Sequence, residues 1–88
     1  MAFTDAQCRA ARALLNWTQE DLVAHSKITK KTIADFERGV TRPHAQTIAQ
    51  IAAAFEAAGI EFLNSDQPGV RFTRQSRRTR STTTRGRN

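Results

Sequence analysis

The sequence is poor in the residues on which several classes of protein depend. It contains one cysteine, two prolines and four glycines among its 88 residues. The single thiol, Cys8, excludes an internal disulfide, and a reducing, cytoplasmic compartment is the simplest setting for it. The cysteine and the two histidines stand apart without metal-ligand spacing, and the scattered glycines form no phosphate-binding loop. We therefore expect no enzyme activity, no metal and no cofactor.

The sequence also has no run of apolar residues long enough to cross a membrane. The longest apolar-rich stretch, residues 48–60, is interrupted by Gln50 and Glu56. The first twelve residues lack a basic segment followed by an apolar run, so no secretory signal is visible. A length of 88 residues with 39% hydrophobic content fits one small globular domain with a single core.

Acidic residues are absent from the last part of the chain, and this changes the meaning of the net charge of +6. Residues 1–70 carry seven lysines and arginines against eight acids, a net charge of −1. Residues 71–88 carry seven arginines and no acid. Because the excess charge belongs to this second part, a nucleic-acid site in residues 1–70 must depend on where its few cations lie.

Three apolar-threonine pairs mark expected helix starts. The threonines are Thr4, Thr18 and Thr29, and another apolar residue follows each of them four positions later. A threonine hydroxyl can accept a backbone N–H at the start of a helix, and the flanking apolar pair matches a hydrophobic staple. Gln7 and Asp21 lie three residues after their threonines, where they can complete capping boxes. The pattern predicts short helices joined by tight connections.

The spacing of apolar residues predicts four helices in all. In the fourth, Ile48, Ile51, Ala52 and Phe55 follow i, i+3, i+4, i+7 spacing, which places them on one buried face. Gly39 supplies a left-handed stop for the third helix. The expected helices span residues 5–15, 19–25, 30–38 and 45–58.

Two short segments of alternating apolar residues follow the helices. Ile60, Phe62, Val70 and Phe72 would share one face of a hairpin formed by residues 60–63 and 70–73. An isolated hairpin is only marginally stable in water, so this one needs a surface on which to pack.

These elements define an all-α fold class with three parts. A compact four-helix domain is expected over residues 1–59, and a short β-hairpin extension over residues 60–73 is a candidate dimer contact. Residues 74–88 contain no bulky apolar side chain, so we expect a disordered, arginine-rich tail.

The functional pattern lies in residues 19–39, where two short helices meet at a turn of three to four residues. Ile33 and Phe36 are expected to face inward, so the opposite side of the second helix is polar. Such a helix fits the major groove of DNA, and residues near its start can reach base edges. The alternative is a solvated lysine face, as on most protein surfaces. The polar stripe consists of Lys30, Lys31, Ala34, Asp35 and Arg38.

Residues 9–60 resemble the Cro/phage-repressor-type helix-turn-helix family, also called the xenobiotic-response-element type. The matching segments are residues 9–12, 17–22, 28–33, 36–39, 42–43 and 48–55. The resemblance implies a compact, lambda-repressor-like helical domain that binds double-stranded operator DNA as a two-fold homodimer and regulates transcription.

The resemblance also implies roles for single residues. Arg12 would pair with Glu37 in a structural role, and Lys27 stands in the turn where the family usually has glycine. A lysine in a left-handed turn costs on the order of 1 kcal/mol relative to glycine. DNA-facing positions are implied for Gln19, Thr29, Lys30, Lys31 and Asp35, with Thr41 and Arg42 near phosphate.

Asp35 has two interpretations at this stage. It can accept a hydrogen bond from a cytosine amino group and so help to select sequence. It can also be the i, i+4 ion-pair partner of Lys31, an interaction worth tenths of a kcal/mol.

Two functions remain open from the sequence. The leading hypothesis is a repressor that blocks polymerase as a homodimer, with dimer contacts from the hairpin and the alanine face of Ala53, Ala54 and Ala57. The alternative is an antitoxin-type protein that binds DNA and neutralises a protein partner through its C-terminal region. The arginines of residues 74–88 fit an arm on phosphates, a solubilising end, or a segment that binds RNA or an acidic protein.

Overall fold

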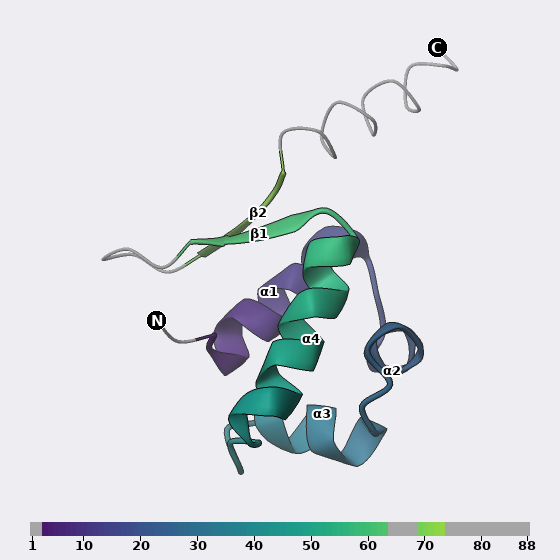
Figure 1. The fold of residues 1–88 in the computed structure, drawn as a ribbon, viewed down its shortest axis with the longest axis vertical. Helices are drawn as coiled ribbons and strands as arrows, with labels where there is room; N and C mark the ends of the chain where they lie inside the picture. Colours follow the sequence, from purple (N-terminus) through teal and green to yellow (C-terminus); the bar gives the residue numbers. More distant parts are fainter. Residues whose placement is uncertain (1–2, 64–68, 74–88) are drawn as a thin grey trace.

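A computed structural model of the chain describes residues 3–63 and 69–73. The expected disordered tail at residues 74–88 lies outside these residues. Figure 1 shows α4 at the centre, with α3 at its N-terminal end and the hairpin at its C-terminal end. The elements in chain order are α1 (Asp5–Leu15), α2 (Gln19–Ser26), α3 (Lys30–Glu37), α4 (Ala45–Ala57), β1 (Ile60–Leu63) and β2 (Gly69–Phe72). The predicted fold class, four helices with a short hairpin, is confirmed.

The three threonines cap α1, α2 and α3 as the sequence predicts. The hydroxyls of Thr4 and Thr18 each accept the backbone N–H three residues later at 3.1 Å, and Thr29 does so at 3.3 Å. The side-chain oxygens of Gln7 and Asp21 accept hydrogen bonds from the backbone N–H groups of Thr4 and Thr18, which completes two capping boxes. These local hydrogen bonds satisfy N–H groups that have no partner inside the helix, and they fix where each helix begins.

The helix ends differ from the prediction by one residue each, except in α1. The second helix extends to Ser26, whereas α3 and α4 stop one residue earlier than expected. Gly39 and Gly59 follow α3 and α4 with φ values of 75° and 97°, so both act as left-handed stops, as predicted for Gly39. Lys27 ends α2 with a φ of 65°, which confirms the left-handed turn at a lysine.

The hydrophobic core lies between the four helices and the hairpin. On α4, Ile48, Ile51 and Phe55 are buried as expected, but Ala52 is only partly buried and Ala54 is buried instead. The buried face of α4 is therefore rotated slightly from the predicted stripe, and both α2 and β1 pack against this helix. The core consists of Phe3, Cys8, Ala11, Leu22, Ile33, Phe36, Ile48, Ile51, Ala54, Phe55 and Ile60.

The hairpin is antiparallel, and it begins its second strand one residue earlier than predicted. Ile60 lies opposite Phe72 and Phe62 opposite Val70, so these four apolar residues share a face as expected. The hairpin packs on α1 and α4. Gln7, 2% exposed, ties it to α1 by donating hydrogen bonds from its amide to the Leu63 and Gly69 carbonyls at 3.1 and 3.0 Å.

None of the helices in the described part of the chain is long and apolar enough to cross a membrane.

Candidate nucleic-acid interface

The turn between α2 and α3 is held by the side chain of Ser26. Its hydroxyl donates to the Leu22 carbonyl at 2.7 Å and accepts the backbone N–H of Ile28 at 3.2 Å. Ile28 packs against the core, and Lys27 supplies the left-handed residue that reverses the chain. The start of α3 is therefore fixed relative to α2 by buried and hydrogen-bonded groups.

One side of α3 is buried and the other is open to solvent. Ile33 and Phe36 are 0% and 2% exposed and belong to the core. On the opposite side, the side chains of Lys30 and Lys31 are 58% and 86% exposed. These two lysines at the start of α3 are therefore open to solvent.

The cations of α3 are paired with acids of the same surface. Lys30 forms an ion pair with Glu20 of α2. Lys31 and Arg38 both bind the Asp35 carboxylate, at 3.1 and 2.5 Å. The hydrogen bond from Lys31 and the neighbouring Arg38 lower the pKa of Asp35. The predicted i, i+4 ion pair between Lys31 and Asp35 is thus present, and the side chain of Asp35 is only 14% exposed.

Gln19 and Ala34 are less exposed to solvent than expected for residues that face DNA. Both are partly buried. The side-chain amide of Gln19 donates a hydrogen bond to a Glu37 carboxylate oxygen at 3.0 Å, beneath the surface of α3. Gln19 therefore connects the start of α2 to the end of α3.

A cleft of about 370 Å³ lies beside α3, between this helix and the start of α4. It brings together five of the predicted residues, Thr29, Lys31, Asp35, Thr41 and Arg42. The guanidinium carbon of Arg42 lies 5.7 Å from the centre of the Phe36 ring. The complete lining is Thr29, Lys31, Thr32, Asp35, Thr41, Arg42, Pro43, His44 and Thr47.

Sequence reasoning missed three polar residues of this surface. Thr32 and Thr47 line the cleft, and Glu20 holds Lys30. His44, the N-cap of α4, also lines the cleft and makes no side-chain capping bond. Glu20 lies next to Gln19 on α2, and only the packing of α2 against α3 shows that it reaches Lys30.

A buried carboxylate at the C-terminal end of α3 connects this helix to α1. Glu37, 4% exposed, accepts two hydrogen bonds from Arg12, both at 2.8 Å. It also accepts one from the Cys8 thiol at 3.2 Å. Burial alone would raise the pKa of Glu37, but the hydrogen bonds from Arg12, Gln19 and Cys8 outweigh burial and lower it. The predicted structural pair of Arg12 and Glu37 is therefore present.

The Cys8 thiol is fully buried at the same place. Burial raises its pKa, and the neighbouring Glu37 carboxylate raises it further. A thiol that stays protonated is a poor nucleophile, so Cys8 acts here as a core residue that donates a hydrogen bond.

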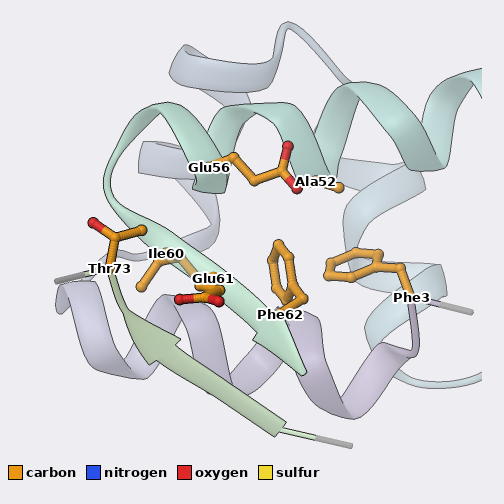
Figure 2. Close-up of a pocket in the computed structure, with 7 residues that line it drawn as sticks. All are labelled: Phe3, Ala52, Glu56, Ile60, Glu61, Phe62 and Thr73. Carbon is orange, nitrogen blue, oxygen red and sulfur yellow. The ribbon is translucent and has the colours of Figure 1, made fainter. Parts of the chain in front are cut away.

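A second hollow, of about 320 Å³, lies at the other end of the molecule between α4 and the hairpin. Figure 2 shows the rings of Phe3 and Phe62 side by side in it, with Ala52 and Glu56 of α4 beside them. The two ring centres are 4.7 Å apart and the rings are nearly perpendicular, at 76°. This hollow is mainly apolar and lies away from the cations of α3.

Two short helices joined by a fixed turn, the second with an open polar face, define a helix-turn-helix domain. A family model described as helix-turn-helix matches residues 9–62. This chain belongs to that family, the Cro/phage-repressor-type helix-turn-helix proteins, and is a DNA-binding transcription regulator. The resemblance stated over residues 9–60 is confirmed. A comparison with curated proteins finds no match.

Proposed function

We propose that the protein represses transcription by binding one duplex sequence with α3 in the major groove. The observation that carries the proposal is the open, polar side of α3, whose buried side is held by Ile33 and Phe36. A helix fixed in this way can hold its exposed side chains in one position relative to the base edges. A bound domain would block polymerase by covering the operator.

We assign the nine site residues to three roles. Lys30 and Lys31, at the start of α3, face the bases together with Ala34 and Asp35. The residues around the cleft, Thr29, Thr41 and Arg42, contact phosphate with Arg38. Gln19 braces the helix pair through Glu37. Phosphate contacts fix the register and base contacts select the sequence.

We further propose that the protein binds as a homodimer. Ala54 is in the core and cannot supply the dimer contact expected of it. Ala53 and Ala57 are exposed on α4, and the apolar hollow with Phe3 and Phe62 offers a further contact. Such a contact lies away from α3, so it leaves the DNA-facing side of each subunit free.

Selection from a library of random duplex DNA tests this proposal. A dimer of this kind should enrich a symmetric sequence with half-sites about one helical turn apart. The variant Lys30→Ala should weaken binding to the selected duplex by about 1–3 kcal/mol and relax the preference at one position. An unchanged affinity together with an unchanged preference would place the DNA site elsewhere on the protein.

The position of Thr73 favours a second candidate function, an antitoxin-type protein. The backbone N–H of Thr73 donates to the Gly59 carbonyl at 2.7 Å, just after the end of α4. Thr73, where the described part of the chain ends, therefore lies beside the C-terminal end of α4. In this candidate function, the arginine-rich residues that follow Thr73 in the sequence would bind a protein partner without competing with DNA on α3. A protein retained on the full chain and lost on removal of residues 74–88, with operator binding intact, would support this candidate.

A further inference from the structure

The first lysine of α3 is already bound to an acid of the preceding helix. Lys30 Nζ donates to Glu20 Oε2, across the turn that joins α2 to α3. Both side chains are well exposed, at 58% and 65%. The pair therefore stands on the open surface of the helix-turn-helix, where a duplex would meet both members at once.

A lysine without such a partner would carry little sequence information. Its ammonium group is a point charge on a flexible stem, and phosphates attract it on any duplex. Glu20 changes this in two ways. Its negative charge disfavours a position against phosphate, and it occupies one of the three ammonium N–H donors, which leaves two for other acceptors.

The pair presents two donors followed by an acceptor. In the major groove, guanine offers the acceptors N7 and O6, and its paired cytosine offers the N4 amino donor beside them. An A·T pair places the adenine amino donor between its two acceptors. Only the G·C order matches an ammonium with two free N–H groups next to a carboxylate.

The other acid of this surface is less suited to such a contact. Asp35 is shared by Lys31 and Arg38, and its side chain is 14% exposed. Glu20 has a single cationic partner among the described residues and is 65% exposed. The open acceptor on this face is therefore Glu20 rather than Asp35.

We propose that Lys30 and Glu20 act as a unit that recognises one G·C base pair, with Lys30 donating to guanine and Glu20 accepting from the cytosine amino group. This inference rests on the proposed placement of α3 in the major groove. It makes Glu20 a specificity-determining residue, in addition to the nine assigned above.

The test measures base preference with the selected duplex and with single base-pair replacements at every position. The wild-type protein should discriminate against replacement of one G·C pair by about 5- to 150-fold, the range for a good base contact. Glu20→Ala should lose most of that discrimination at this position only. It should also bind a scrambled duplex of equal length more tightly, because an acid facing phosphate has been removed.

Two further variants separate this role from bulk charge. Glu61→Ala removes the same charge from an exposed ion pair with Arg71 on the hairpin, and it should leave every base preference unchanged. In a Lys30→Ala background, Glu20→Ala should cause no further loss of discrimination at the G·C position. A non-additive pair of this kind is expected only when the two residues act on the same base pair.

The outcomes distinguish this inference from the proposed function. If Lys30→Ala alters the preference and Glu20→Ala does not, α3 lies in the groove but Glu20 takes no part in recognition. If Glu20→Ala and Glu61→Ala gained equal affinity and kept every base preference, the proposal that Lys30 and Glu20 recognise one base pair together would also be wrong. If no sequence is enriched at all, the proposed function itself fails.

Discussion

At the scale of single residues, Glu37 shows how the recognition surface is supported. Its carboxylate accepts hydrogen bonds from Arg12 on α1 and from Gln19 on α2, while Arg9 donates to its backbone carbonyl. Glu37 is itself the last residue of α3. The three helices thus meet at one buried charge, and the position of α3 relative to α1 and α2 depends on it.

Removing the partner of this charge should be costly. Arg12→Met leaves the Glu37 carboxylate buried without its cation, and we expect a loss of about 3 kcal/mol in the free energy of unfolding. Arg71→Met removes an exposed partner of Glu61, and it should cost less than about 1 kcal/mol. Urea unfolding of both variants measures the difference. If both variants lost less than about 1 kcal/mol of unfolding free energy, water would be solvating the Glu37 carboxylate in the folded protein.

The lowered pKa of Glu37 predicts a pH dependence of stability. A carboxyl whose pKa is lower in the folded chain binds protons more weakly there than in the unfolded chain. Its stabilising contribution is present above the ordinary glutamate pKa of about 4.3, and it is lost as pH falls through the lowered value. Glu37→Gln has no such proton to bind, so its unfolding free energy should fall less than that of wild type between pH 6 and pH 3. Parallel curves would show that other acids cause the acid sensitivity.

At the scale of elements, the helix starts were predictable and the extent of burial was not. Thr4, Thr18 and Thr29 cap their helices through bonds to residues three positions away, so the sequence contains the whole signal. Ala54 is buried and Ala52 only partly so, and which side of α4 is covered depends on α2 and β1, segments far apart in the sequence that pack on this helix. The pair of Lys30 and Glu20 escaped sequence reasoning for the same reason, because it joins two helices across their turn.

The end of α2 offers a prediction with an internal control. Lys27 has a φ of 65°, a conformation that costs a lysine on the order of 1 kcal/mol relative to glycine. Lys27→Gly should therefore stabilise the fold by about 0.5–1 kcal/mol, measured as a higher urea midpoint. Asn16 ends α1 with a similar φ of 59°, and asparagine tolerates this region well. Asn16→Gly should gain less, and no gain for Lys27→Gly would show that the side chain of Lys27 adds no strain.

At the scale of the whole molecule, charge is divided between two ends. The cations of α3 are paired with Glu20 and Asp35, and residues 1–70 have a net charge of −1. The arginine-rich segment follows Thr73 in the sequence, and Thr73 lies beside the C-terminal end of α4. The sequence shows how charge is divided along the chain, and the fold shows where Thr73 lies relative to α4.

This division predicts different salt dependences for the two regions. Six arginines lie in residues 74–88, and each phosphate that they neutralise should add about 0.9 to the slope of log affinity against log salt. Changing all six to glutamine should weaken binding to every duplex alike and flatten that slope by up to about five. The ratio of selected to scrambled duplex should stay constant, because α3 still supplies the base contacts. Titrations at several salt concentrations provide the measurement. An unchanged slope would mean that these arginines do not reach DNA, and it would shift the balance toward a protein partner at the end of the molecule opposite α3.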